Sequence, residues 1–202
     1  MSDSALMPGR TRWRRFAIAM VPATVIIGGI VVGLANGAVA ASFSVSGQQF
    51  KVSADNLHGT GFRQFSSLDT AADGTQIPIA GSVIDNATLT NLCQSVNVPN
   101  PLGMNIVLRI EAGGGGTPAT AQGLTIGLTK LQGNATFTNI QIGRDGGDVS
   151  GIPQLSGSFA QSADEVNIDG LRQIATSTSA GTFALNGLTM AVLTGDDARE
   201  CF

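Results

Sequence analysis

The sequence predicts an all-β domain over residues 42–202, preceded by one membrane-spanning or export segment. Apolar residues alternate with polar ones at a period of two, and Gly, Asn, Asp and Ser interrupt the apolar runs. No stretch of about 12 residues carries the i, i+3, i+4, i+7 stripe of an amphipathic helix. We expect a single β-sandwich or barrel-like domain with bulged short strands, and a short β-solenoid is the alternative.

Residues 1–41 have the features of an export segment. Four arginines at positions 10–15 precede an uncharged, mostly apolar run at 16–35, which is long enough to cross a bilayer. Ala38-Val39-Ala40 is a good cleavage site, so the segment is either a retained anchor or a signal removed at Ala40/Ala41. The positive-inside rule predicts a basic cytoplasmic segment (1–15), a transmembrane helix or export signal (16–41) and an extracytoplasmic domain (42–202).

Gly29, Gly33 and Gly37 recur every fourth residue in this apolar segment. Small residues at that spacing allow two membrane helices to approach closely. If the segment is retained, these glycines are the face on which a homodimer would pair through its transmembrane helices.

The alternating runs predict the strands in order. The repeating pattern places apolar residues on one face and Ser, Thr or other polar residues on the opposite face. We expect strands around residues 43–45, 50–54, 77–79, 104–110, 124–128, 137–142, 166–168, 183–185 and 188–192.

One phrase occurs twice in this domain. Residues 86–92 read Asn-Ala-Thr-Leu-Thr-Asn-Leu and residues 134–140 read Asn-Ala-Thr-Phe-Thr-Asn-Ile, with looser copies at 166–171 and 183–188. In each copy the alternation slips by one residue at an Asn, Asp or Gly, which predicts a bulge or a tight bend. The uneven spacing of the copies argues against a solenoid of fixed period.

Charge excludes one class of partner. Residues 1–41 hold four of the 11 basic and one of the 14 acidic residues, which leaves the domain with a net charge of about −6. An acidic domain lacks the electrostatic footprint of a nucleic-acid-binding protein.

Two glycine-rich loops are expected. Residues 111–120 predict a flexible turn, without the Gly-Lys-Ser/Thr of a phosphate loop. Residues 143–151 place Asp145 and Asp148 in a second turn, where two carboxylates are a weak calcium candidate because calcium needs about 6–8 oxygen ligands. We predict no cofactor and no metal site.

Cys93 and Cys201 are the only cysteines of the chain. In an exported domain an even number of cysteines predicts a disulfide, and an intermolecular bridge is the alternative. Two thiols and one distant histidine make a poor set of metal ligands.

The sequence gives catalysis little support, and we predict no catalytic residue. His58 is the sole histidine and lies in Asn56–Gly61, which has the composition of a turn. No Gly-x-Ser-x-Gly motif occurs. The adjacent carboxylates Asp164-Glu165 and Asp196-Asp197 would face opposite ways in a strand and are expected to be solvated.

Several phrases of the chain have a distinctive wording, at residues 41–54, 59–62, 87–96, 113–118, 139–145 and 200–202. In these phrases the chain resembles an uncharacterised family of actinobacterial membrane or envelope proteins. The likeness covers nearly the whole chain and implies no functional residues, because the family has no established active site. Some members are labelled "cholesterol esterase", a label that the single histidine and the missing nucleophile motif do not support.

Three classes of function follow from these features. The first is a non-enzymatic, membrane-anchored envelope protein that binds a partner protein or envelope component. The second is a carrier or sensor of an apolar ligand such as a lipid, which predicts an internal cavity. The third is a secreted ester hydrolase. The cavity of the second class would be lined by Phe50, Ile106, Phe137 and Phe183.

Overall fold

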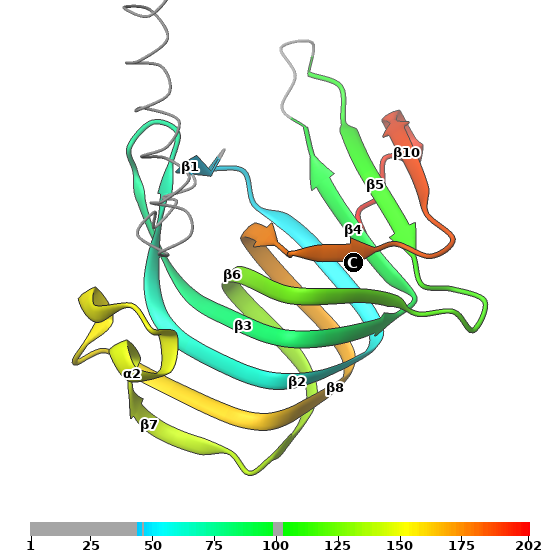
Figure 1. The fold of residues 1–202 in the computed structure, drawn as a ribbon. Coiled ribbons are helices and arrows are strands. Elements are labelled where there is room, and N and C mark those ends of the chain that lie inside the picture. Colours follow the sequence, from blue (N-terminus) through cyan, green and yellow to red (C-terminus); the bar gives the residue numbers. More distant parts are fainter. Residues whose placement is uncertain (1–43, 46, 99–102) are drawn as a thin grey trace, which may run out of the picture. The chain divides into compact units, whose positions relative to one another are not determined.

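Four long strands build the centre of the fold: β2 (Phe50–Ala71), β3 (Gln76–Thr90), β6 (Ala119–Thr138) and β8 (Phe159–Ser179). The computed structural model describes residues 44–45, 47–98 and 103–202. The strands pair antiparallel in a closed cycle, β2 with β3, β3 with β6, β6 with β8 and β8 with β2 (Figure 1). The predicted all-β, barrel-like fold is therefore confirmed, and the antiparallel cycle selects the barrel over the solenoid.

The barrel interior is filled by aliphatic side chains from all four strands. Leu57, Leu124, Leu171 and Val166 are among the largest fully buried side chains. They belong to one apolar cluster, against which Phe50, Phe137 and Phe183 pack while partly exposed. Burial of such side chains is the main stabilising contribution to the barrel.

The strands are longer than the short strands that we expected. Strand β2 has 22 residues, β6 has 20 and β8 has 21. Glycine usually indicates the end of a strand, but some glycines lie inside these strands. At these positions neighbouring atoms leave no room for a side chain. A Cβ on Gly59 would lie 2.6 Å from Ile84 Cγ2, and Gly61 has a φ of 68° beside Asp85.

A three-stranded extension continues the sheet beyond β2. It consists of β4 (Leu92–Asn97), β5 (Ile106–Ala112) and β10 (Thr189–Thr194), in the order β10-β5-β4-β2. Figure 1 shows the three strands standing to one side of the barrel. We call these strands the extension sheet.

Three short strands complete the sheet. They pair with the long strands and lie outside the closed cycle. Strand β1 (Ser44–Val45) pairs parallel with β2, β7 (Gln141–Asp145) pairs with β8, and β9 (Thr182–Ala184) pairs with β6.

The repeated phrase marks matching bends. Asn91 and Asn139, the sixth residues of the two copies, have left-handed φ values of 51° and 55° and directly follow β3 and β6. The amide of Asn91 donates to Asp55 (2.5 Å), and that of Asn139 donates to Asp164 (2.7 Å). In the looser copies, Gly170 (φ 62°) lies inside β8 at a register shift with β6, and Gly187 (φ 68°) follows β9. The predicted bends are confirmed.

The second glycine-rich segment, 143–151, is more ordered than the turn that we expected. It contains the end of β7 and a short helix, α2 (Gly146–Ser150), followed by a 3₁₀ helix (Pro153–Leu155). Val149 of α2 packs on Phe65 and Ala160 of the barrel wall. By contrast, residues 113–118 are a loop between β5 and β6, as the sequence predicts.

The predictions for the N-terminal region lie outside the described residues. These are the basic segment (1–15), the apolar segment (16–41) and the glycine face of Gly29, Gly33 and Gly37. Within the part of the chain that the structure describes, no helix has both the length and the apolar character needed to cross a membrane.

Candidate functional site

The two faces of the extension sheet differ in what covers them. Antiparallel register places Met190 opposite Ile110 and Val192 opposite Leu108, and Val96 lies on the other side of Leu108. Residues directly opposite each other point to the same side of a sheet. We call Val96, Leu108, Ile110, Met190 and Val192 the apolar face.

The apolar face continues the inner surface of the barrel. Leu92 and Ala112, which pair with each other at the start of the same alternation, are buried in the barrel core. Farther from the barrel the same face is open, with Met190 60% and Val192 67% exposed. Gln94, opposite Ile110, is a polar residue on this side, and exposed apolar side chains grouped around it are typical of an interaction site.

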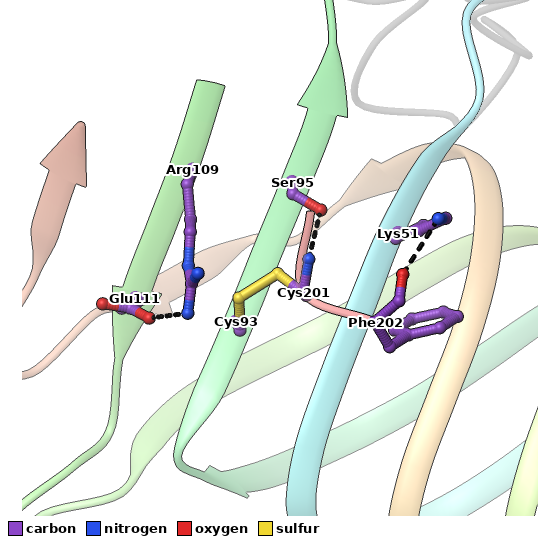
Figure 2. Close-up of a disulfide and its surroundings, with 7 residues drawn as sticks. All are labelled: Lys51, Cys93, Ser95, Arg109, Glu111, Cys201 and Phe202. Carbon is purple, nitrogen blue, oxygen red and sulfur yellow. Dashed lines mark hydrogen bonds and ion pairs between the residues drawn. A yellow bond between two sulfur atoms is a disulfide. The ribbon is translucent and has the colours of Figure 1, made fainter. Parts of the chain in front are cut away.

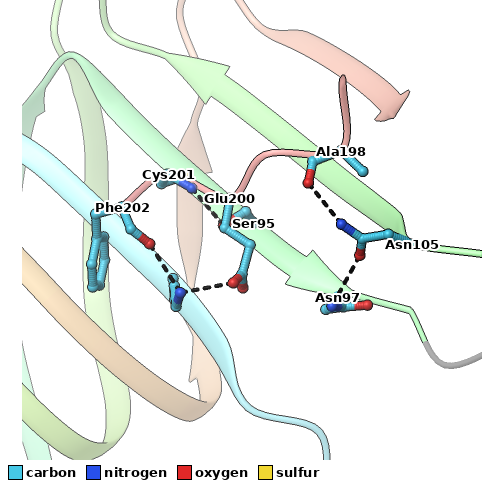
Figure 3. A network of polar contacts seen from close by, with 8 residues as sticks. Ser95, Asn97, Asn105, Ala198, Glu200, Cys201 and Phe202 are labelled. Carbon is cyan, nitrogen blue, oxygen red and sulfur yellow. Dashed lines mark hydrogen bonds and ion pairs between the residues drawn. The ribbon is translucent and has the colours of Figure 1, made fainter. Parts of the chain in front are cut away.

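The opposite face is covered by residues 198–202, which we call the strap. The Cys93–Cys201 disulfide joins the strap to β4, with the two Cα atoms 5.8 Å apart (Figure 2). The structure thus carries the intramolecular disulfide predicted from the cysteine count. Beside it, the Cys201 N–H donates to Ser95 Oγ at 3.0 Å, and Asn105 Nδ2 donates to the carbonyl oxygen of Ala198 at 3.0 Å (Figure 3).

Strand β2 also holds the strap. Lys51 Nζ donates to Glu200 Oε2 at 2.7 Å and to the carbonyl oxygen of Phe202 at 2.9 Å. The Phe202 ring lies near two cations, 5.4 Å from Lys51 Nζ and 5.7 Å from Arg172 Cζ. These contacts fix the strap across β4 and β2, so the part of this face next to the barrel is already occupied.

The open hollows among the described residues include two on the barrel. One, of about 500 Å³, is mainly polar and includes Ser53, Asp55, Asn91 and Arg172 beside the strap. The other, of about 750 Å³, is more apolar and includes Leu68, Ile79 and Leu128. In the first hollow the Asp55 carboxylate accepts a hydrogen bond from Asn91 rather than from Ser53, so the geometry gives no reason to assign a reaction.

The interior offers little room for a ligand. A small cavity of about 20 Å³ is lined by residues that include Leu57, Leu124, Thr178 and Phe183. Of the four residues expected to line a lipid cavity, only Phe183 borders it, while Phe50 and Phe137 pack against the core. Pockets for small ligands typically measure about 300–1,000 Å³, so this cavity is far smaller than such a pocket.

The side chains considered for catalysis are all exposed. His58 is exposed, but the predicted turn around it is wrong, because it lies within β2 opposite Thr88 of β3. Asp164 accepts a hydrogen bond from Asn139, and its neighbour Glu165 is exposed. Asp196 and Asp197 are exposed in a 3₁₀ helix, Gly195–Asp197.

Asp145 has a structural role. Its carboxylate accepts the N–H of Gly147 at 2.8 Å, that of Gly157 at 2.6 Å and that of Asp148 at 3.4 Å. These hydrogen bonds, with that from Gly157 the largest contribution, lower the pKa of Asp145. Within the described part of the chain no three His, Cys, Asp or Glu side chains group as metal ligands.

Fold and surface together define an all-β barrel whose extension sheet is strapped on one face and apolar on the other. Residues 46–202 match the family of unknown function DUF6230, and the chain belongs to this family. The family has no assigned function, so its membership supports the predicted likeness to an uncharacterised family and adds no site residue. No curated protein and no solved structure shows a significant match.

Sequence reasoning did not single out the apolar face or the strap. Alternation at 104–110 and 188–192 was visible, but alternation alone does not say whether the apolar side is covered. The strap has no signal beyond Cys201, because its other contacts join residues that lie about 100 or more positions apart in the chain.

Proposed function

We propose that this protein is a non-enzymatic, membrane-anchored cell-envelope protein whose β-domain binds a partner protein or another envelope component. The observation that carries the proposal is the apolar face. Val192 and Met190 are exposed there beside half-buried Leu108 and Ile110. Transfer of apolar surface out of water would drive association at this face.

The sequence supports the location that this function requires. The arginines at positions 10–15 and the apolar run at 16–35 favour a membrane anchor with the domain outside the cytoplasm. The likeness of the sequence to an actinobacterial envelope family and the disulfide agree with an extracytoplasmic domain.

The anchor is tested by N-terminal sequencing of the mature protein and by membrane fractionation. We expect the chain in the membrane fraction with residues 16–41 retained. A mature protein that starts at Ala41 and is recovered in the soluble fraction would rule out the tether.

Partner binding is tested with a photo-cross-linking residue at Met190 in the full chain, expressed in its native membranes. The matched control carries the same residue at Ile142, which is 67% exposed on β7. We expect one reproducible adduct with a different protein or envelope component from position 190 and none from 142. Equal labelling at both positions, or no adduct with a different protein or component from position 190, would count against partner binding at the apolar face.

A further inference from the structure

Strand β10 presents an open edge. Among the described residues it pairs with β5 on one side and with no strand on the other. The Gly195 N–H donates to the Asn105 carbonyl oxygen at 3.1 Å, which continues the β10–β5 register by one residue. Hydrogen bonding alternates along an antiparallel pair, so the N–H and C=O groups of Met190, Val192 and Thr194 point to the open edge.

This edge lacks the features that protect edges in natural sheets. Residues 189–194 read Thr-Met-Ala-Val-Leu-Thr, with no charge and no proline, and the pairing with β5 runs without a bulge. Natural edge strands carry charges, prolines or bulges that prevent pairing with another chain. An edge without them is suited to accept a further strand.

Strand β7, at the other end of the sheet order, is different. It has five residues, including the charged Arg144 and Asp145, and its pairing with β8 shifts register between Ile142 and Arg144. Charge and a bulge are both present on β7 and both missing on β10. This contrast singles out β10 as the edge that is suited to pairing.

We propose that a second copy of this chain pairs with β10, strand against antiparallel strand, around a two-fold axis at Ala191. In this register Met190 of each copy lies opposite Val192 of the other. Both residues point their backbone groups to the edge, so the hydrogen bonds are reciprocal, as a two-fold interface requires. Opposite side chains point to the same side, and the two apolar faces join into one.

Three observations favour a second copy over an unrelated strand. The centre of segment 189–194 complements itself, because Met190 meets Val192 and Ala191 meets Ala191 in the register centred on Ala191, while Thr189 meets Leu193. Gly29, Gly33 and Gly37 independently predict pairing of two anchors. A tether to one membrane also raises the effective concentration of two copies. This last point rests on the proposed function, whereas the strand pairing needs only β10.

The experiment is disulfide cross-linking of the full chain with Ala191→Cys, in membranes under mild oxidation, read on a non-reducing gel. Facing residues of a non-hydrogen-bonded antiparallel pair have Cα atoms about 4.5 Å apart, which is within the range of a disulfide. We expect a covalent dimer. Ile142→Cys, on the protected edge β7, is the matched control and should remain monomeric.

A second variant tests the contact itself. Val192→Lys, combined with Ala191→Cys, places two lysines at the paired edges while changing a side chain that is 67% exposed, so the fold should be retained. We expect the cross-linked fraction to fall about tenfold, because each lysine would lie opposite Met190 of the other copy in place of an apolar contact, and a loss of about 1.4 kcal/mol changes an equilibrium by that factor.

Three outcomes would overturn the proposal: no dimer from Ala191→Cys, equal dimer from Ile142→Cys, or an undiminished dimer after Val192→Lys. Circular dichroism of each variant verifies the β-fold. Fractionation of the same cells reports the anchor separately. Cross-linking of a chain found in the soluble fraction would contradict the tether and support the strand pairing.

Discussion

The barrel and the extension sheet differ in how their strand edges and their faces are covered. The barrel pairs its long strands in a closed cycle and buries one apolar cluster inside. The extension sheet has an open edge at β10, and it is covered on one face by a strap that is bonded covalently through Cys93 and Cys201. We infer that the barrel is the stable support and the extension sheet the surface available for interactions.

The largest expected effect is loss of barrel packing. Leu57 is 2% exposed, and Leu57→Ala should lower the free energy of unfolding of the protein by about 2–5 kcal/mol because it leaves a cavity. The control Leu68→Ala, on the same strand but 54% exposed, should change it by less than about 0.5 kcal/mol. Denaturant unfolding measures both variants. Equal losses would contradict the barrel as the stable support.

Removal of the disulfide should affect the extension sheet first. Cys93→Ser with Cys201→Ser should lower stability by about 2–4 kcal/mol, since the bond constrains the unfolded chain over a separation of 108 residues. Hydrogen exchange should show lost protection in β5 and β10 while β8 retains it. Uniform loss across all three strands would show that strap and barrel unfold as one unit.

Two asparagines at matching bends allow the extension sheet and the barrel to be compared by single substitutions. Asn91 lies between β3 of the barrel and β4 of the extension sheet, whereas Asn139 lies between β6 and β7. Replacing either by Ala should cost about 1–2 kcal/mol, because alanine disfavours the left-handed region.

Hydrogen exchange locates the effect of each substitution. Asn91→Ala should reduce protection in the extension sheet, and Asn139→Ala near β7. Replacing each Asn by Gly, which tolerates a positive φ, provides the control. Loss of protection at the same amides in both Ala variants would contradict separate roles for the two asparagines.

The smallest expected effect is a pH dependence at the α2 end of the barrel. Hydrogen bonds from Gly157, Gly147 and Asp148 lower the pKa of Asp145 in the folded protein. A carboxylate with a lowered folded pKa stabilises the protein above its unfolded pKa, near 3.8, and this contribution is lost as the pH falls through the folded pKa. Asp145→Asn should therefore reduce the loss of stability on acidification, as measured by thermal unfolding between neutral and acid pH. If Asp145→Asn lost as much stability at acid pH as the unchanged protein, this contribution of Asp145 would be contradicted.

Much of the fold could be predicted because its signals are local. Alternation of apolar residues gave the all-β class, and the slip of alternation at Asn91 and Asn139 gave the bends. Strand lengths were underestimated because glycines such as Gly59 have the composition of a break. Close contact with Ile84, rather than a turn, requires a glycine at that position.

The candidate site was harder to predict because its contacts are distant in sequence. Lys51 meets Glu200, and Ser95 meets Cys201, through a topology that alternation does not specify. Asp145 was considered as a calcium ligand, yet the N–H groups of Gly147 and Gly157 engage its oxygens. These N–H donors come close to the Asp145 carboxylate only in the folded chain, so its structural role could not be predicted from the sequence.

The closed cycle of the barrel has a consequence for the order in which the chain can fold as it is synthesised. Phe50, at the start of β2, pairs with Ala175 of β8. The backbone groups on one edge of β2 therefore gain their hydrogen-bond partners only after β8 has been synthesised. Until then the nascent chain has an incomplete ring with a free strand edge, and closure depends on contacts between distant residues, which slow folding. Holding this early strand apart from other chains until β8 emerges is therefore a requirement of the topology.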